Sequence, residues 1–256
     1  MKLTSKQVAQ YQRDGFYRFG PLLSVEEISE LKKRFDNLFA GTKFEDPRHA
    51  RVARELRTTE SGEAKDSIQQ LINVYKMDDA FEALIHDPRI LDVTESLIGA
   101  NIQILADQAL LKPALHGGAL PWHQDNAYFN LTPPDSVTCW IALTDVTEEN
   151  SPVRFLPGSH KNGLIEHKAG FEGTILREAK VDASGAVTVT LPVGGASWHH
   201  CDVLHQSQPN RSPRPRPAYA IQFFSASCRS TTGDQVKDDE RNKELRTRLL
   251  VRGKLD

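Results

Sequence analysis

The stretch Trp122-His123-Gln124-Asp125-Asn126-Ala127-Tyr128-Phe129 is the part of this 256-residue chain that best indicates its fold. It places an imidazole and a carboxylate one residue apart. On a β-strand, side chains two residues apart face the same side, so we expect His123 and Asp125 to point together while Gln124 points away. A further histidine, His205, comes much later in the chain and would reach the same place from another strand.

Two neutral imidazoles and one carboxylate on one face of a metal form the facial triad of non-haem Fe(II) sites, which leaves coordination positions open. We therefore expect His123, Asp125 and His205 to be the metal ligands and the catalytic centre. Arg216 is a candidate clamp for a carboxylate, because a guanidinium can meet a carboxylate with two parallel hydrogen bonds. A His-x-Asp pair alone arises by chance in many chains, usually on the surface, so the surrounding sequence has to decide.

The composition is that of an ordinary globular protein, with 39% hydrophobic and 26% charged residues and a formal net charge of −2. This charge excludes a strongly basic nucleic-acid-binding domain. The three scattered cysteines do not make a disulfide framework, no run of apolar residues is long enough for a membrane span, and the N-terminus lacks a signal-peptide core. We expect a cytoplasmic protein with no membrane or nucleic-acid partner. Its oligomeric state, monomer or homodimer, stays open.

Residues 1–100 are expected to be mainly helical. Thr4-x-x-Gln7 and Ser24-x-x-Glu27 are capping-box patterns, and each precedes a helix. A short strand is expected at 16–19, and two short helices at 80–86 and 89–97. The polar segment 42–66 is interpreted as a lid over the site or, equally, as a solvated surface loop.

From residue 101 the pattern changes to short β-type runs separated by glycine, proline and asparagine. These runs are 101–112, 137–146, 153–156, 187–191 and 218–226. Helices followed by strands indicate an α+β fold that is mainly β, a double-stranded β-helix (a cupin-like jelly roll) buttressed by N-terminal helices. We expect one domain over 1–256, with a helical buttress at 1–100, a jelly-roll core at 101–228 and a C-terminal segment at 229–256.

Four sequence blocks occur in an order that resembles the phytanoyl-CoA dioxygenase family of Fe(II)/2-oxoglutarate-dependent oxygenases. The first is the stretch around His123, and the others are Val137-Thr138-Cys139-Trp140-Ile141-Ala142-Leu143, the run Asn150-Ser151-Pro152-Val153-Arg154-Phe155-Leu156-Pro157-Gly158-Ser159-His160, and His205-Gln206-Ser207-Gln208-Pro209-Asn210-Arg211-Ser212 leading to Arg216. Asp14-Gly15-Phe16 also resembles the opening of that family. One departure is Ser151, which stands where the family usually has glycine.

The resemblance implies that His123, Asp125 and His205 bind Fe(II) and that Arg216 binds the distal carboxylate of 2-oxoglutarate. Arg214 competes with Arg216 for that role, although the family spacing favours Arg216. The other cofactor-binding candidates are Ser207, Trp140, Gln108 and the weaker candidate Lys76. Core packing is the compatible alternative for Trp140, and a structural or surface role is the alternative for Gln108 and Lys76.

Candidate substrate-lining residues follow the metal motif or precede His205. Strand alternation points one of His199 and His200 inward, and His200 is chosen as the candidate, although a hydrogen-bonded structural histidine is the commoner case. The full set is Asn126, Tyr128, Phe129 and His200, together with part of 42–66.

The resemblance implies an Fe(II)- and 2-oxoglutarate-dependent dioxygenase that consumes O2 and releases succinate and CO2. We expect it to hydroxylate an unactivated C–H bond of a small metabolite or biosynthetic intermediate, with desaturation, ring closure or epimerisation as other outcomes. Two alternatives stay open. One is a cupin-like protein with another metal, and the other is a non-catalytic small-molecule-binding protein.

Overall fold

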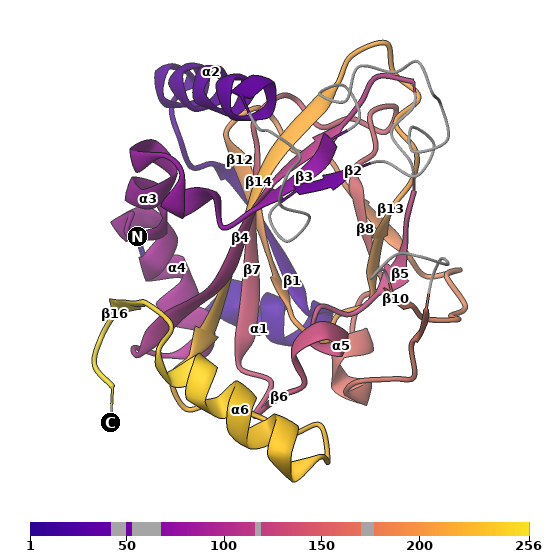
Figure 1. The fold of residues 1–256 in the computed structure, drawn as a ribbon. Helices are drawn as coiled ribbons and strands as arrows, with labels where there is room; N and C mark the ends of the chain where they lie inside the picture. Colours follow the sequence, from indigo (N-terminus) through magenta and orange to yellow (C-terminus); the bar gives the residue numbers. More distant parts are fainter. Residues whose placement is uncertain (42–49, 53–67, 116–118, 170–176, 256) are drawn as a thin grey trace.

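The computed structural model describes residues 1–41, 50–52, 68–115, 119–169 and 177–255 (Figure 1). It begins with α1 (Ser5–Asp14), β1 (Phe16–Pro21) and α2 (Val25–Gly41). The expected capping box of α1 is present, because the Thr4 hydroxyl accepts from the amide of Gln7 while the Gln7 side chain accepts from the amide of Thr4. Gly15 ends α1 with a left-handed backbone, φ +82°, which favours glycine.

A large antiparallel sheet is the central layer. Its strands lie in the order β1-β12-β7-β14-β4-β3-β2, and β16 also pairs with β4. Besides β1, the strands are β2 (Ala50–Val52), β3 (Ile68–Ile72), β4 (Ile102–Lys112), β7 (Ser136–Ala142), β12 (Gly195–His200), β14 (Arg216–Ser225) and β16 (Leu250–Arg252). β14 and β7 are buried along their whole length, so this layer is covered on both faces.

A smaller sheet lies opposite the large one, in the order β11-β8-β13-β5 (Figure 1). Its strands are β5 (Leu120–His123), β8 (Val153–Phe155), β11 (Val187–Val189) and β13 (His205–Ser207). Two-stranded pairs complete the strand set: β6 (Leu131–Thr132) with β15 (Arg229–Ser230), and β9 (Lys168–Ala169) with β10 (Arg177–Glu178). Two antiparallel sheets face to face are the architecture expected of a double-stranded β-helix.

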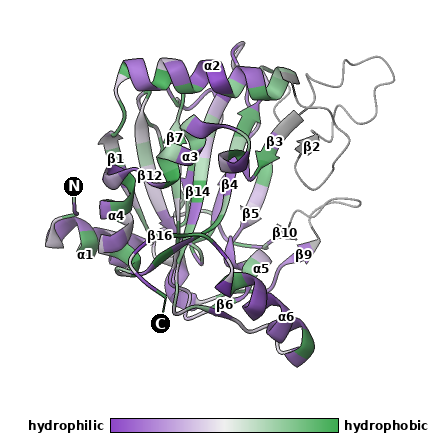
Figure 2. Cartoon of the chain, turned by 60° about the vertical axis from the view of Figure 1, so that its left-hand side comes forward, coloured by the Kyte–Doolittle hydropathy of each residue, from purple (hydrophilic) through white to green (hydrophobic). Residues whose placement is uncertain are grey.

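The two faces of the large sheet pack against different partners because successive side chains alternate. On one face Cys139, Ile141 and Tyr219 join the core under the helices α2, η3 (Val74–Lys76), α3 (Asp79–Ile85) and α4 (Pro88–Ile98). On the other, Trp140 and Ala220 face the small sheet. Figure 2 shows the hydrophobic residues gathered along these strands, while α6 (Gln235–Arg246) is mostly hydrophilic.

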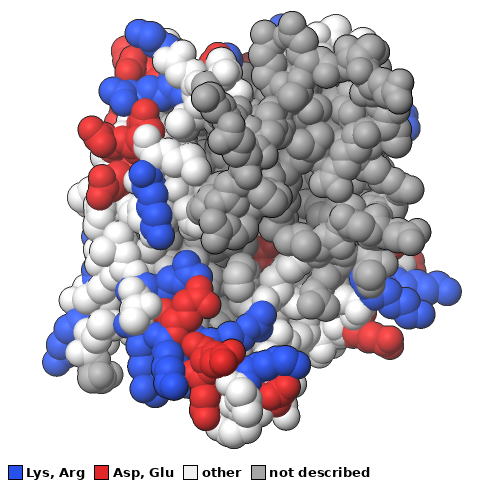
Figure 3. Space-filling view, in the orientation of Figure 1, with Lys and Arg blue, Asp and Glu red and all other residues white. Residues whose placement is uncertain are grey.

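The α6 helix carries acidic and basic side chains interspersed, so this part of the surface has no single sign (Figure 3). Its buried residue, Leu245, packs in a small cluster with Leu105 and Phe224. No helix among the described residues is long and apolar enough to cross a membrane.

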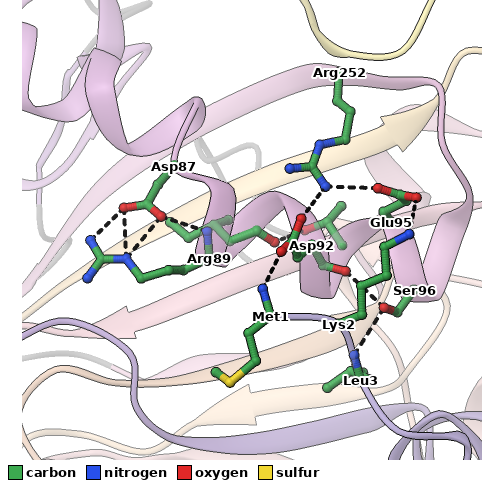
Figure 4. A network of polar contacts seen from close by, with 11 residues as sticks. Met1, Lys2, Leu3, Asp87, Arg89, Asp92, Glu95, Ser96 and Arg252 are labelled. Carbon is green, nitrogen blue, oxygen red and sulfur yellow. Dashed lines mark hydrogen bonds and ion pairs between the residues drawn. The ribbon is translucent and has the colours of Figure 1, made fainter.

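The two ends of the described chain meet on α4 (Figure 4). Arg252 of β16 donates to Asp92 at 2.7 Å and to Glu95 at 2.8 Å, and Lys2 donates to Glu95 at 2.6 Å. The amide of Leu3 donates to Ser96. Ion pairs on a protein surface are weak singly, but these share two carboxylates and so fasten both ends to one helix.

The fold class inferred from sequence is confirmed, and the helices and the strands after residue 101 lie close to their expected places. Sequence inspection missed β3 as a strand of the large sheet. Of the expected lid at 42–66, Ala50–Val52 forms strand β2 beside β3, and the remainder lies outside the described residues.

Candidate active site

His123 and His205 lie opposite each other on neighbouring strands of the small sheet. They are a register pair of β5 and β13, and their ring centroids are 4.1 Å apart. In each imidazole Nδ1 contacts a backbone carbonyl two residues earlier, Pro121 at 2.9 Å and Val203 at 3.0 Å. Since a carbonyl can only accept, Nδ1 carries the hydrogen and Nε2 keeps its lone pair for a metal.

Asp125 completes the group from a turn and not from the strand. β5 ends at His123, and Asp125 is the residue before the short helix α5 (Asn126–Phe129), with α-type backbone angles. The expectation that both ligands share one strand is therefore wrong, although the turn brings them together all the same. Asp125 Oδ1 lies 3.8 Å from His123 Nε2 and 3.7 Å from His205 Nε2.

Gln124 points away from the triad, as expected, but it is fully buried and held by hydrogen bonds. Its amide nitrogen donates to the carbonyls of Gly163 at 2.8 Å and Asp202 at 2.7 Å, and its oxygen accepts from the amide of Ile165. Asp202 belongs to the turn that leads into His205. Gln124 therefore links the two chain segments that carry the three ligands.

The protonation states suit a divalent metal. Burial lowers the pKa of His123 and lowers that of His205 well below its ordinary value, so both rings are neutral at neutral pH. Burial opposes ionisation of Asp125, yet the surrounding imidazoles, His205 first, lower its pKa below the ordinary range. Neutral imidazoles and a carboxylate are the forms that bind metal ions, and two nitrogens with one oxygen suit Fe(II).

Arg216 is a buried cation at the start of β14. It is 3% exposed, and neither Nε nor Nη1 has a hydrogen-bond partner among the described residues. Its guanidinium lies 5.1 Å from the ring centroid of Trp140. Burial lowers its pKa to about 10, which still leaves it charged at neutral pH. A buried, unpaired guanidinium is costly unless an anion completes it.

The residues near Arg216 in sequence or in strand register differ in how suited they are to bind a carboxylate. Ser207 is buried and, two residues after His205 on β13, shares its strand face. Arg214, the competitor for the clamp, is exposed. Lys112 is the register partner of Arg216 across β4, and its ammonium donates to the carbonyl of Gln208 at 3.2 Å.

Gln108 and Lys76, the remaining cofactor-binding candidates, have different surroundings. Gln108 of β4 lies in one register row with Ala220 and Trp140, and its amide donates to Gln222 at 3.1 Å. Lys76 is exposed at the end of η3, whose Val74 packs in the core under the helices, and its ammonium lies over the ring of Tyr75. Lys76 is thus not brought to the triad.

The inward histidine of β12 is His199 and not His200. His199 is 2% exposed, and its Nε2 lies 3.4 Å from Asp125 Oδ2. His200 faces the other way, toward the rings of Tyr11 and His160, and its Nδ1 accepts from the amide of Asp202. The choice of His200 as a substrate-lining residue is therefore corrected by the pairing register of β12.

The residues after the metal motif have different surroundings. The rings of Tyr128 and His123 meet edge to face, at 6.3 Å between centroids, so Tyr128 lies beside the triad. The Asn126 side chain closes its own turn, because it accepts from the amide of Leu131 and donates to the Leu131 carbonyl. Phe129 packs on the cluster that holds Leu245. Neither Asn126 nor Phe129 is brought to the triad by these contacts.

Thr138 is the residue that sequence inspection missed at this site. Its hydroxyl donates to Asp125 Oδ2 at 2.7 Å. The signal was present, since Thr138 lies two residues before Trp140 on a strand and so faces the same side.

Comparisons with known proteins agree with this geometry. The sequence model of the family described as "Phytanoyl-CoA dioxygenase (PhyH)" matches residues 11–218. An ectoine dioxygenase of Bordetella parapertussis is 27% identical over 84% of this chain and 73% of that protein. An L-proline trans-4-hydroxylase of Streptomyces griseoviridis is 26% identical over 84% of each chain.

Solved structures show the same fold. The apo form of the non-heme monooxygenase ThoJ superposes with a TM-score of 0.72 at 25% identity, covering 97% of this chain and 84% of the other. EctD from S. alaskensis in its apo form superposes with a TM-score of 0.73 at 21% identity, covering 90% and 79%. The family match spans most of the chain and includes all three triad residues. The chain therefore belongs to the phytanoyl-CoA dioxygenase family and is a 2-oxoglutarate-dependent non-haem iron dioxygenase.

Proposed function

We propose that this enzyme hydroxylates an unactivated C–H bond of a small free metabolite or biosynthetic intermediate, and that residues 1–256 act as one catalytic domain. His123, Asp125 and His205 would hold Fe(II), which supplies the oxidising chemistry with 2-oxoglutarate and O2 when bound. The protein contributes neutral imidazoles with fixed ring orientation and a carboxylate anchored by Thr138. These contacts keep the metal ligands in place without further rearrangement.

The main support is the buried guanidinium of Arg216, whose Nε and Nη1 have no hydrogen-bond partner among the described residues. It lies beside Trp140, on the face of the large sheet that is turned toward the small sheet of His123 and His205. A dicarboxylate held at the metal would present its far carboxylate to this guanidinium. An anionic co-substrate would supply the missing acceptors, and a charge-assisted bidentate pair is the strong form of that contact. Ser207, on the same strand face as His205, would assist at the same carboxylate.

Support for a small free substrate comes from the relatives and from the surroundings of the metal. The similar proteins act, by their names, on ectoine and L-proline, both small molecules. Tyr128, whose ring lies beside that of His123, would line the substrate pocket. The three cysteines are buried free thiols, which suits the reducing cytoplasm that we expect for this enzyme.

The test is an anaerobic titration of the apoprotein with Fe(II) and then 2-oxoglutarate, followed by the visible charge-transfer band of the chelate. We expect the band in the wild type, its loss in His205→Ala, and weakening of the 2-oxoglutarate affinity by about 10-fold or more in Arg216→Ala, since a charged hydrogen-bonded pair is lost. Arg214→Ala is the matched control and should behave as wild type. Iron binding without a band in the wild type would overturn the co-substrate assignment.

A further inference from the structure

His199 is a buried imidazole whose two ring nitrogens both lack a hydrogen-bond partner among the described residues. Its ring lies 4.6 Å from that of His205 and 5.3 Å from that of Phe155, between centroids. A buried polar group without a partner lowers the free energy of unfolding by about 1–3 kcal/mol, so a functional role is expected for such a group.

Among the described residues, the carboxylate of Asp125 lies within reach of the His199 ring. Its Nε2 lies 3.4 Å from Oδ2 of Asp125, a contact whose direction falls outside that of a hydrogen bond. Both ring nitrogens are shielded from solvent by the described residues. On its other side the ring meets the apolar Phe155.

We propose that His199 is a positioning residue that, together with Thr138, holds Oδ2 of Asp125 and so leaves Oδ1 alone to bind the metal; this rests on the proposed iron site. A small turn of the ring would convert the 3.4 Å contact into an N–H···O bond. Thr138 already donates to the same oxygen at 2.7 Å, from the strand next to that of His199.

The arrangement has a consequence for coordination. A carboxylate that is free to rotate can bind a metal through both oxygens and occupy an additional position. With two donors on Oδ2, Asp125 presents one oxygen, which lies nearly equidistant from Nε2 of His123 and Nε2 of His205. The positions opposite the triad then stay open for the co-substrate and O2.

The experiment measures Co(II) binding to the apoprotein by competition with a chelating indicator, together with the d–d absorption spectrum at saturation. His199→Phe keeps the ring shape beside Phe155 and removes the donor. His199→Gln restores an N–H near the place of Nε2. His200→Asn is the matched control, because it lies next in the chain on the opposite strand face and keeps an acceptor for the amide of Asp202. Circular dichroism melts establish that each variant is folded.

We expect His199→Phe to bind Co(II) about 10-fold more weakly, the loss typical of removing a partner of a metal ligand. His199→Gln should recover most of that loss, and His200→Asn should match the wild type. Wild-type affinity in folded His199→Phe overturns the proposal. So does a saturated His199→Phe spectrum with a lower coordination number, because His199 would then be a metal ligand. A higher coordination number supports the proposal, because Asp125 would then bind through both oxygens. If the wild type binds no Co(II), the iron site itself fails, which is a distinguishable result.

Discussion

The hydroxyl of Thr138 donates a 2.7 Å hydrogen bond to Oδ2 of Asp125, and this bond joins the large sheet to the turn after β5. Thr138 lies on β7, whereas His123 and His205 belong to the small sheet on the other side of the interior. The carboxylate ligand is therefore held by one sheet and the imidazole ligands by the other. Metal affinity should consequently depend on how the two sheets are packed.

Replacing Thr138 by valine keeps the side-chain shape and removes the donor to Asp125. We expect Co(II) or Fe(II) affinity to fall by about 10-fold, because the carboxylate loses the partner that orients it. Competition with a chelating indicator measures the change. Thr132→Val, the same substitution at an exposed site, is the control. Equal affinity of the wild type and Thr138→Val would show that the hydroxyl does not orient the ligand.

Asn210 fixes the loop that leads to Arg216. It is fully buried, its Nδ2 donates to the carbonyls of Lys112, Pro113 and Arg214, and its Oδ1 accepts from Ser212. Asn210→Ala leaves these buried groups unpaired and should lower the free energy of unfolding by about 2–4 kcal/mol.

The same variant should weaken 2-oxoglutarate binding more than Fe(II) binding, because it loosens the strand start that places Arg216. Isothermal titration with each ligand separates the two effects. Arg211→Ala, an exposed change in the same loop, should alter neither. If both ligands were weakened equally in Asn210→Ala, the loop would not act through Arg216.

Asp107 is a buried carboxyl group whose titration should make the stability of the fold depend on pH. It is fully buried, and burial raises its pKa to about 6 despite hydrogen bonds from the Tyr219 hydroxyl at 2.6 Å and the Tyr75 amide at 2.9 Å. The folded protein therefore binds a proton that the unfolded chain releases near pH 4. The contribution of Asp107 to stability is then fully present below about pH 4 and is lost as the pH rises through about 6, by roughly 3 kcal/mol in total.

Asp107→Asn keeps an acceptor for Tyr219 and Tyr75 but cannot ionise. We expect the variant to gain stability relative to the wild type as the pH rises from 4 to 7, as measured by urea unfolding at several pH values. Asp79→Asn, at an exposed position, should show no such trend. A pH-independent difference between wild type and Asp107→Asn would contradict the raised pKa.

Gly15 lies at a close approach between α1 and the turn before His205. Its φ is +82°, and an added Cβ would lie 2.5 Å from Nδ1 of His160 and 2.9 Å from a methyl of Val203. Gly15→Ala should cost about 2–4 kcal/mol, since both the left-handed backbone and the overpacking are unfavourable. Gly20→Ala has open space at its Cβ and should change the melting temperature little. Equal thermal melts for the two variants would refute this account.

Much of the fold was predictable because its signals are local. Capping boxes place α1 and α2, and short β-type runs bounded by glycine, proline and asparagine place β4, β7 and β14. The strand β3 was missed since its pairing partner, β4, lies far along the chain and its own five residues carry no distinctive pattern. Short strands depend on what they pack against more than on their own sequence.

At Ser151, too, a contact distant in the sequence matters more than the local residue type. The family usually has glycine there, and Ser151 adopts φ +71°, the left-handed conformation that glycine would take. The hydroxyl of Ser151 donates to the carbonyl of Gln208. The turn therefore persists although its residue differs, because a tertiary contact compensates the local cost.

The chemistry of the site follows from residue types, since His123, Asp125, His205 and Arg216 carry groups that bind a metal or a carboxylate wherever they meet. Which side chains surround them depends on how the chain is folded. The pairing register of β12 turned His199 inward and His200 outward, and a turn in place of a strand presented Asp125. Which residues can bind a metal follows from single residue types. Their orientation depends on strand pairings between residues distant in the chain, and no local sequence pattern predicts these pairings.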